Sequence, residues 1–328
     1  MGDERSREMY QNRIDYSNGA KEAIERIVRS VRQGKDFIDF MRKHQDHLYI
    51  FGAGMLGQDL ADTWNWKFGF QAFIDNDCSK HGMYIQNIPV ISLEEIKDKK
   101  SAAIIIMNKF HWHEIEKQLR ENHFCESQIL NLGEGYRQFN NDQYFDLEQL
   151  KITDGECFVD CGVLDGETSL NFLDRYQDRV KEIWMFEPDK NNVTKVKKNF
   201  EGKAVDYKVI QKGVWSSATT LCFNSLGNGC AGIDENGEDQ IETVKLDDAL
   251  AGCDPTFIKM DIEGAELEAL RGAEHTIKRC RPKLAISVYH KPEDIAEIPR
   301  LLLEYCADYK FYLRHYSLMS SETILYAL

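Results

Sequence analysis

Residues able to do chemistry gather in a loop near the middle of the chain, after an apolar run that ends at Asp160. Gly162 and Gly166 make this loop wide, which suits a flat nucleoside or an amino-acid group better than a pyrophosphate. Asp160, at the end of an expected strand, can hold an ammonium group directly or through water by a charge-assisted hydrogen bond. We therefore predict a binding loop that also includes Asp165 and Thr168.

The expected strands that follow also end in polar or small residues. Glu187 closes the next strand, where a carboxylate can accept hydrogen bonds from both hydroxyls of a ribose. Gly213 and Val214 follow the third strand. Asp261 follows the fourth strand and His290 follows the fifth. Because the carboxyl ends of parallel strands meet at one edge of a sheet, these residues predict a single ligand site there.

A different glycine loop lies nearer the N-terminus. Gly52, Gly54 and Gly57 stand between an apolar run and a helical pattern, in the spacing G-x-G-x-x-G. Such glycines provide a tight turn, a close approach of backbone to phosphate, and close helix–strand packing. Asp75 ends the following strand, where an acid can bind ribose hydroxyls. The pattern predicts a nucleotide site. The segments IFGAGMLGQDL at 50–60 and FIDND at 73–77 resemble the N-terminal domain of sugar-modifying proteins related to nucleotide-sugar binders, which implies a nucleotide-sugar as the ligand. The alternatives are NAD for redox chemistry, or glycines that serve folding alone.

Strands and helices alternate in both halves of the chain, which indicates parallel sheets covered by helices. We expect an α/β fold with two Rossmann-like three-layer domains. The expected parts are a helical N-terminal arm (1–46), a nucleotide-binding-type domain (47–133), a connector (134–150) and a second domain (151–328). Strands are expected at 48–51, 71–74, 88–90, 102–106, 157–160, 182–186, 207–211, 257–260, 284–288, 311–314 and 323–326. The last two should pair as an antiparallel hairpin because little chain separates them.

Composition excludes several classes of protein. The chain has 328 residues and a formal net charge of −14, so a basic surface for nucleic acid is not expected. Its apolar runs are far shorter than the roughly 20 residues of a membrane-spanning helix. The nine cysteines form no C-x-x-C pair, which favours reduced thiols, a cytoplasmic location and no structural zinc. His111, His113 and Glu114 fall at an expected helix start and are interpreted as a solvated cap, so no metal is predicted.

Several motifs of the second half resemble one known family. They are VDCGVLDGETS at 159–169, FEPD at 186–189, KMDIEGAELEAL at 259–270 and SVYHKPEDI at 287–295. With these motifs the chain resembles, from about residue 150 to 328, the FkbM-type family of S-adenosylmethionine-dependent methyltransferases. The resemblance implies a seven-stranded sheet that ends in an antiparallel hairpin. It also implies that the cofactor, S-adenosylmethionine, is surrounded by Asp160, Gly162, Asp165, Gly166 and Glu187.

The chain departs from this family at two places. Its loop reads CGVLDG where many relatives have GANIG or GANVG, so Leu164 and Asp165 should change the pocket. Residues 224–232 stand where relatives have a Ser-rich segment, which is expected to cover the acceptor. The resemblance therefore implies the cofactor more closely than the acceptor.

The resemblance implies transfer of a methyl group to a hydroxyl of a sugar, a glycan precursor or a small metabolite. His290 is the first candidate for the base, because an ordinary histidine titrates near neutrality. The alternative is a histidine that orders its loop by bonding to backbone. Asp261 is a second candidate base, or it orients the methionine ammonium or an acceptor hydroxyl. Glu266 is interpreted as an acid that meets a helix dipole.

Two other functions stay open at this point. One is an NAD-dependent sugar oxidoreductase that acts through the N-terminal glycine loop. The other is a non-catalytic ligand-binding or scaffold protein. The helical arm at 1–46 is a candidate contact for a homo-oligomer.

Overall fold

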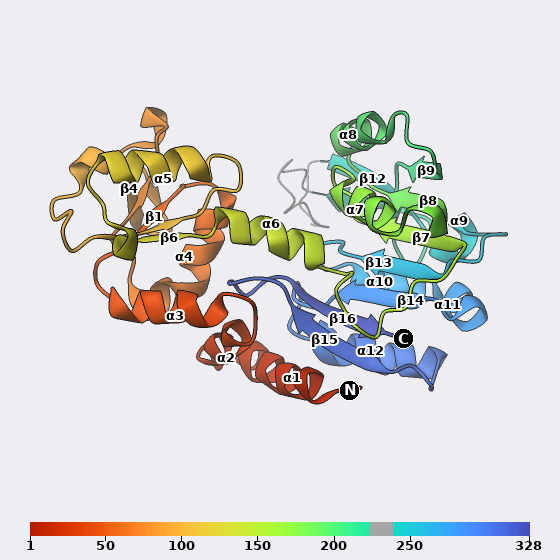
Figure 1. Cartoon of the computed structure of the whole chain (residues 1–328). Coiled ribbons are helices and arrows are strands. Elements are labelled where there is room, and N and C mark those ends of the chain that lie inside the picture. Colours follow the sequence, from red (N-terminus) through yellow and green to blue (C-terminus); the bar gives the residue numbers. More distant parts are fainter. Residues whose placement is uncertain (224–238) are drawn as a thin grey trace. The chain divides into compact units, whose positions relative to one another are not determined.

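The computed structural model describes residues 1–223 and 239–328, and this chain divides into two compact units (Figure 1). The larger unit comprises Met1–Ala20, Asn141–Arg314 and Glu322–Leu328, and the smaller unit comprises Lys21–Asn140 and His315–Ser321. The expected arm at 1–46 is thus divided between the units. The segment 224–232, expected to cover an acceptor, lies outside the described residues. Within the described part of the chain, no helix is both long and apolar enough to cross a membrane.

A seven-stranded sheet is the centre of the larger unit. Its strands are β7 (Glu156–Cys161), β8 (Val180–Phe186), β9 (Asp206–Ile210), β13 (Phe257–Met260), β14 (Lys283–Ser287), β15 (Phe311–His315) and β16 (Thr323–Ala327). The order across the sheet is β15-β16-β14-β13-β7-β8-β9. Neighbours from β9 to β14 are parallel, whereas β16 is antiparallel to β14. Lys310 and Leu328 exchange both backbone hydrogen bonds, which is the antiparallel pattern. The expected fold class is confirmed.

The parallel strands of this sheet end in register. Cys161 of β7 lies opposite both Phe186 of β8 and Met260 of β13. Ile210 of β9 and Ile286 of β14 continue the same row. The residues that follow these positions therefore emerge together at one edge of the sheet.

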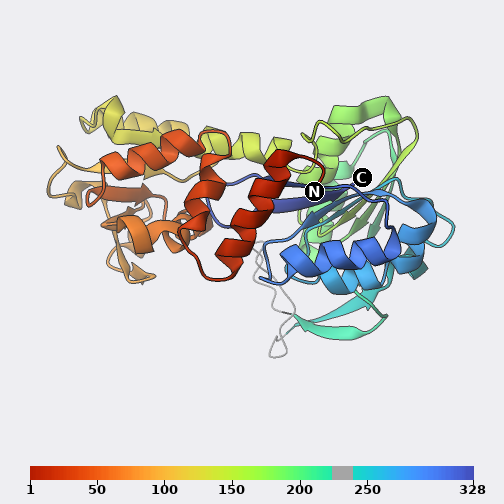
Figure 2. The same cartoon turned by 90° about the horizontal axis from the view of Figure 1, so that it is seen from below.

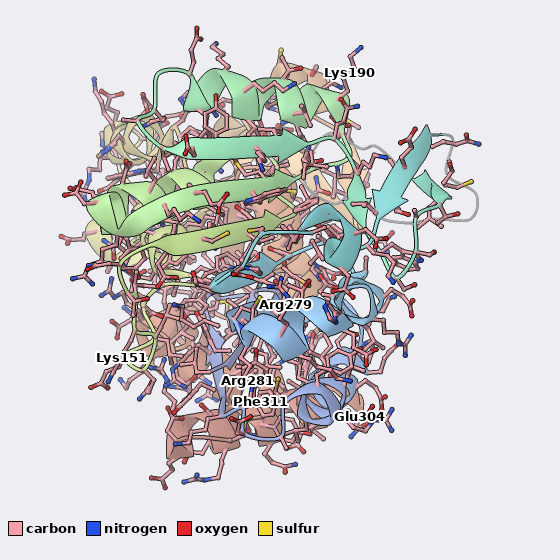
Figure 3. The ribbon with its side chains drawn as sticks, turned by 90° about the vertical axis from the view of Figure 1, so that its right-hand side faces the viewer. Lys151, Lys190, Arg279, Arg281, Glu304 and Phe311 are labelled. Atoms are coloured by element: carbon pink, nitrogen blue, oxygen red, sulfur yellow. The ribbon has the colours of Figure 1, made fainter. Side chains whose placement is uncertain are left out.

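Helices cover both faces of the seven-stranded sheet (Figure 1 and Figure 2). One face carries α7 (Glu167–Tyr176) and α8 (Lys190–Phe200), and the other carries α10 (Glu266–Arg271), α11 (Glu274–Cys280) and α12 (Asp294–Tyr305). The unit also holds α9 (Leu246–Ala249), a 3-10 helix (Gln177–Arg179) and a small sheet of β10 (Gly213–Val214), β12 (Asp239–Val244) and β11 (Thr220–Phe223). Figure 3 shows the sheet with Lys190 at the start of α8 and Arg279 near the end of α11.

An aromatic cluster packs α7 onto the sheet. Phe158 of β7 stacks on Phe172 of α7, with the ring centres 4.2 Å apart. Phe257 of β13 contacts both rings, and Phe145 and Tyr176 complete the cluster. Burying each large apolar side chain contributes about 1.5–3 kcal/mol. The cluster therefore fixes β7 and the loop that follows it.

The first helix of the larger unit, α1 (Glu4–Ser17), is fastened to β15. Asp3 caps the helix by accepting from the backbone N–H of Ser6, and its carboxylate lies 2.6 Å from the guanidinium of Arg314. The hydroxyl of Ser6 accepts from the backbone N–H of Leu313 at 3.0 Å. Met9 is also buried. These residues at the start of α1 therefore contact β15 of the same chain. Contact between two copies of the chain through the segment 1–46 stays a prediction.

A six-stranded sheet is the centre of the smaller unit. Its strands are β1 (Leu48–Phe51), β2 (Ala72–Ile74), β3 (Tyr84–Ile85), β4 (Ile88–Ile91), β5 (Ala103–Ile106) and β6 (Ile129–Asn131), in the order β3-β4-β2-β1-β5-β6. Only the pair of β3 and β4 is antiparallel among these described strands. The helices are α2 (Ala23–Arg29), α3 (Gly34–Lys43), α4 (Met55–Phe68), α5 (Trp112–Glu121) and α6 (Gly133–Asp142), with 3-10 helices at Cys78–Lys80, Leu93–Glu95 and Glu126–Gln128.

Opposite faces of this sheet carry α4 and α5. Successive residues of a strand point to opposite faces. Ile50 of β1 lies beside Gly57 of α4. The next residue, Phe51, packs in a core cluster with Ile115 and Leu119 of α5. Helices thus cover both faces, as the alternating pattern predicts.

Glu25 joins three helices of the smaller unit. Its carboxylate on α2 lies 2.9 Å from Arg29 of the same helix, 2.5 Å from Arg42 of α3 and 2.6 Å from Lys67 of α4. Burial alone raises the pKa of Glu25, but the hydrogen bonds from these three cations lower it to about 2. Since the charged form is stabilised in the folded state, this carboxylate contributes to stability.

Replacing Glu25 with glutamine should destabilise the smaller unit by about 1–2 kcal/mol near pH 7. The folded-state pKa is about 2 and the ordinary value is 4.5, so the stabilisation is present above 4.5 and is lost as the pH falls toward 2. Chemical denaturation near neutrality and at about pH 3 measures this difference. The exposed Glu22→Gln is the control. Equal stability of wild type and Glu25→Gln near neutrality would contradict the prediction.

Candidate active site at the carboxyl edge of the larger sheet

A buried ion pair joins the two central strands of the larger sheet. Lys259 of β13 lies opposite Asp160 of β7, and its ammonium is 2.9 Å from the Asp160 carboxylate. The ammonium also donates to the carbonyl of Gly162 at 2.7 Å, and the hydroxyl of Ser169 donates to Asp160 at 2.6 Å. Burial lowers the pKa of Lys259, but the carboxylates of Asp160 and Asp261 raise it above its ordinary value. The ammonium that Asp160 holds is therefore that of a lysine in the same chain.

The loop after β7 has a backbone that favours glycine. Gly162 has a φ of +81°, and a Cβ there would lie 1.8 Å from the carbonyl oxygen of Asp261. Leu164 and Gly166 also have positive φ, at +56° and +89°. The carboxylate of Glu187 accepts from the backbone N–H of Leu164 at 2.9 Å. The loop is thus held between the ends of β13 and β8.

Glu187 follows β8 and is almost fully buried. Besides the N–H of Leu164, its carboxylate accepts the backbone N–H of Asp189 at 3.0 Å and the side-chain amide of Asn192 at 3.5 Å. Burial raises the pKa of Glu187, although these hydrogen bonds act in the opposite direction. A carboxylate offers about four acceptor positions, so Glu187 retains capacity for a further hydroxyl donor.

Asp261 follows β13 and is held by two tyrosines. The hydroxyl of Tyr144 donates to its Oδ2 at 2.7 Å, and that of Tyr289 donates to its Oδ1 at 3.2 Å. Burial raises the pKa of Asp261, but the charges of His290 and Lys259 lower it below the ordinary value. The result is an ionised carboxylate with a fixed orientation.

His290 lies among three carboxylates. Its Nδ1 is 2.9 Å from Glu266, and its Nε2 is 3.5 Å from both Asp261 and Glu263. Burial lowers the pKa of His290, but the bond with Glu266 and the negative charges raise it to about 9. The ring therefore carries a proton at neutral pH. His290 thus differs from an ordinary histidine, which titrates near neutrality, because these carboxylates stabilise the imidazolium.

Glu266 and Glu263 belong to the turn between β13 and α10. Glu266 begins α10, as the helix-dipole interpretation requires, but it is fully buried and accepts the backbone N–H of Ile262 at 2.9 Å. Glu263 has a φ of +55°, which non-glycine residues rarely adopt. Burial and the neighbouring carboxylates raise the pKa of Glu263 to about 7, against the lowering effect of His290. Both residues therefore take part in the environment of His290.

Tyr144 contacts Asp261, and Gln143 joins Tyr144 to Glu322, but the sequence predicted none of these three residues for the site. Tyr144 lies in the segment expected to be a connector, 117 residues from Asp261. Gln143 donates to the carboxylate of Glu322, which comes just before β16. Burial and the charge of Asp261 raise the pKa of Glu322 to about 7. These contacts join distant parts of the chain, so local periodicity could not reveal them.

The other residues predicted for the cofactor lie in two places. Asp165 and Thr168 are in the loop and in the first turn of α7, where Asp165 accepts the backbone N–H of Glu167 at 3.0 Å. Gly213 and Val214 form β10, which pairs with β12 in the three-stranded sheet. The in-register row of strand ends thus brings together the loop, Glu187 and the Asp261 group, while Gly213 and Val214 belong to a separate pairing.

The N-terminal glycine loop is held by contacts within the smaller unit. A Cβ on Gly57 would lie 2.0 Å from the carbonyl oxygen of Gly52, so Gly57 is needed for packing of α4. A Cβ on Gly54 would meet nothing within 4 Å among the described atoms. Asp75 accepts the backbone N–H of Ala53 at 3.0 Å. The acid expected to bind ribose hydroxyls therefore binds the loop itself.

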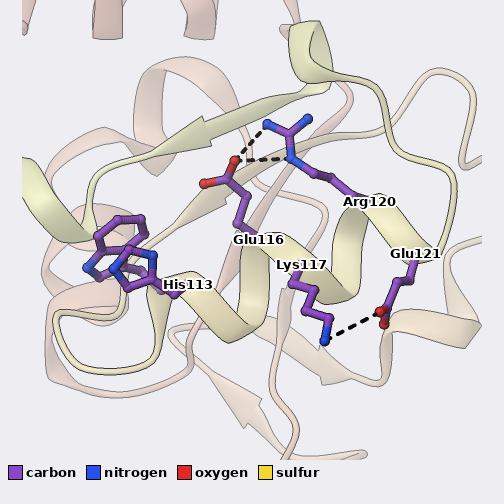
Figure 4. Close-up of a pocket in the computed structure, with 6 residues that line it drawn as sticks. His113, Glu116, Lys117, Arg120 and Glu121 are labelled. Carbon is purple, nitrogen blue, oxygen red and sulfur yellow. Dashed lines mark hydrogen bonds and ion pairs between the residues drawn. The ribbon is translucent and has the colours of Figure 1, made fainter.

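An open pocket lies on α5 (Figure 4). It is lined by Trp112, His113, Glu116, Lys117, Arg120 and Glu121. His113 stacks on Trp112, with ring centres 3.2 Å apart, and Glu116 pairs with Arg120 at 2.7 Å. These are contacts along the surface of one helix.

Two groups of side chains could each hold a metal ion within the described ranges 1–223 and 239–328. One is Cys157, Glu182 and Cys253, and the other is Asp261, Glu266 and His290. His111 and His113 belong to neither group. The second group lies in the row of strand ends described above.

The part of the chain that contains these strand ends is similar to a known protein family. Residues 160–311 match the family model of the methyltransferase FkbM domain. The matched region contains Asp160, Glu187, Asp261 and His290 of the candidate site. The resemblance inferred from the sequence motifs is confirmed for this region. Residues 44–130 match a second model, described as C2185-like, N-terminal.

A solved structure has a similar fold over nearly the whole chain. It is the crystal structure of methyltransferase FkbM from Methylobacillus flagellatus KT, with a TM-score of 0.56 and 19% identity over 96% of this chain and 100% of that chain. Fibrillarin from Aeropyrum pernix with bound S-adenosyl-L-methionine gives a TM-score of 0.38 and 10% identity, covering 59% of this chain and 75% of its own. The precorrin-6y C5,15-methyltransferase from Geobacter metallireducens GS-15 gives a TM-score of 0.34 and 9% identity. This match covers 53% of this chain and 80% of that chain. The TM-scores of the last two structures are too low to support any conclusion about the fold. A comparison with curated proteins returned no match.

Gly162→Ala should disrupt the candidate site much more than Gly202→Ala does. Both glycines have positive φ, +81° and +76°, but only at Gly162 would a Cβ meet another atom within 4 Å. The left-handed backbone alone costs roughly 1–2 kcal/mol for alanine, and the collision with Asp261 adds to it. Thermal unfolding of the two variants measures the difference. An equal loss in both would mean that the loop does not pack against Asp261 as described.

Proposed function

We propose that the larger unit binds S-adenosylmethionine and transfers its methyl group to a hydroxyl of a sugar, a glycan precursor or a small metabolite. One observation carries this proposal. The loop at 162–166, Glu187 and Asp261 emerge next to one another from strands that end in register, inside the FkbM domain. Ligands of open parallel sheets bind at this edge. The hydroxyl acceptor follows from the resemblance to the family and from the carboxylate at Asp261.

The residues at this edge fit a donor of this kind. When bound, S-adenosylmethionine supplies an electrophilic methyl group on a positively charged sulfur. Glu187 has an acceptor position left for one ribose hydroxyl, and its 3.5 Å bond from Asn192 is long enough to be exchanged for the second. The negative charge of Glu187 favours a cationic ligand. Asp160 is occupied by Lys259, so we assign it to shaping the loop instead of contacting the donor directly.

Asp261 suits the orientation of an acceptor hydroxyl. Its carboxylate is ionised, and Tyr144 and Tyr289 fix its direction. A hydroxyl that donates to this carboxylate would be held with its oxygen free to approach the methyl group in line. Positioning of this kind supplies much of the rate in group transfer. We assign Asp261 as a catalytic residue and His290 as the positioning residue that stabilises its charge.

Glu187→Ala should weaken the binding of S-adenosylmethionine tenfold or more, because the ribose hydroxyls lose their acceptor. A tenfold change corresponds to about 1.4 kcal/mol. Calorimetric titration of the full chain measures the affinity. Glu201→Gln, an exposed carboxylate at the end of α8, is the control and should bind like wild type. NAD is the parallel ligand. If NAD bound to folded wild type and S-adenosylmethionine did not, the function would belong to the smaller unit.

Asp261→Asn and His290→Gln should lower kcat by about tenfold or more while the affinity for S-adenosylmethionine stays within about twofold. The reason is that both side chains act on the acceptor and not on the ribose. Transfer of a tritiated methyl group to a panel of sugars and nucleotide-sugars measures the rate. Glu268→Gln on α10 is the matched control and should keep the wild-type rate. A full rate in Asp261→Asn on an identified acceptor would remove Asp261 from the mechanism.

We also propose that the N-terminal glycine loop binds the ligand predicted from its sequence, a nucleotide or nucleotide-sugar. Gly54 offers an open backbone for the approach of a phosphate. Asp75 is engaged with Ala53, so a ligand there would use backbone groups of the loop more than this carboxylate.

A further inference from the structure

The Nε2 atom of His290 is a buried polar atom without a hydrogen-bond partner among the described residues. The side chain is 10% exposed. Its other ring nitrogen, Nδ1, is 2.9 Å from the carboxylate of Glu266, which is fully buried. Nδ1 has no hydrogen-bond partner among the described residues either, so its contact with Glu266 is an ion pair. This ion pair orients the ring and leaves Nε2 directed at other groups.

Two carboxylates face this free nitrogen. Asp261 Oδ1 and Glu263 Oε2 are each 3.5 Å from His290 Nε2. Ligands bound to one ion at about 2.1 Å lie roughly 3.0–3.5 Å from one another. Both oxygens therefore lie at the distance from Nε2 that separates two ligands of one ion. Asp261 and His290 also form, with Glu266, a group whose possible ligand atoms all lie within 4.8 Å of one another. The left-handed φ of Glu263 brings its carboxylate to this position from a turn that glycine would form more easily.

Buried carboxyl oxygens in this region lack hydrogen-bond partners among the described residues. Glu266 Oε2 has no hydrogen-bond partner among the described residues, and neither has either carboxylate oxygen of Asp294. Both side chains are almost fully buried. Unpaired buried carboxylates are costly unless a cation joins them. This is a second reason, independent of the spacing, to expect a cation.

We infer that His290 Nε2, Asp261 Oδ1 and Glu263 Oε2 bind one divalent metal ion, with Glu266 holding the ring of His290 from behind. The ion takes the place of the Nε2 proton, which is released to solvent water. One imidazole and two carboxylates suit Mn²⁺, Fe²⁺ or Zn²⁺. Metal-binding histidines commonly donate their second ring N–H to a carboxylate, which is the place of Glu266. This inference departs from the sequence-based prediction of no metal. The three ligands follow two different strands, and their spacing along the sequence does not show that they lie together.

The role of this ion rests on the proposed function, whereas its binding does not. An oxygen bound to a divalent ion loses its proton more readily. An acceptor hydroxyl placed on the ion would release its proton to solvent water, and its oxygen would then form the new bond to the methyl group as the bond to sulfur breaks. The neutral thioether leaves with the electron pair of that bond.

Titration of the metal-free full chain with Mn²⁺ tests the site without donor or acceptor. Electron paramagnetic resonance measures free Mn²⁺, and competition with Mg²⁺ and Zn²⁺ follows. We expect one ion per chain, and at least tenfold weaker binding in Glu263→Gln and His290→Ala. Glu268→Gln, two residues from Glu266 on α10, is the matched control and should bind like wild type. Circular dichroism checks folding, and the isosteric Glu263→Gln keeps the test valid if His290→Ala unfolds.

Either of two results would overturn the inference. One is a folded wild type that binds none of the three ions. The other is binding that survives in Glu263→Gln but is lost in Cys253→Ser, which would place the ion at the Cys157 group. Failure of the methyltransferase proposal is a separate outcome, because absent S-adenosylmethionine binding leaves the Mn²⁺ titration unchanged.

Discussion

The buried ion pair between Lys259 and Asp160 is the interaction on which the candidate site depends. It joins the two central strands and ties the carbonyl of Gly162 to the same ammonium. A buried ion pair is weak evidence for net stability, but losing one partner leaves an uncompensated charge that costs about 3–5 kcal/mol. Its contribution here is geometric, because it fixes the loop after β7 relative to the end of β13.

Once these strand ends are fixed, electrostatics divides the edge of the sheet into two regions. Near β8, Glu187 binds backbone amides and keeps room for hydroxyl donors. Near β13 and β14, acidic side chains surround a single imidazole, and the pKa values shift in opposite directions: that of His290 rises to about 9, and that of Asp261 falls. The first region suits a ribose, and the second suits a cation or a hydroxyl. A methyl donor whose ribose lay at Glu187 would place its methyl group toward an acceptor hydroxyl held by Asp261.

Local patterns in the sequence predict the parts of this fold that short-range physics determines. The predicted strands 48–51 and 257–260 coincide with β1 and β13, because continuous apolar runs bounded by turn residues indicate buried parallel strands. Two-residue strands such as β3 and β10 carry no such pattern. In the site, strand-end position sufficed to find Glu187 and Asp261. Tyr144 and Glu322 reach Asp261 only through tertiary contacts, and the raised pKa of His290 comes from carboxylates on another loop.

The central claim is that the methyl donor binds at the carboxyl edge of the larger sheet. Its most direct test is photo-crosslinking of methyl-labelled S-adenosylmethionine to the full chain, followed by peptide mapping. The account predicts label in peptides from 157–190 or 257–290, and its loss when excess unlabelled S-adenosylhomocysteine is present. Label confined to peptides from 48–80, around the N-terminal glycine loop, would contradict the account.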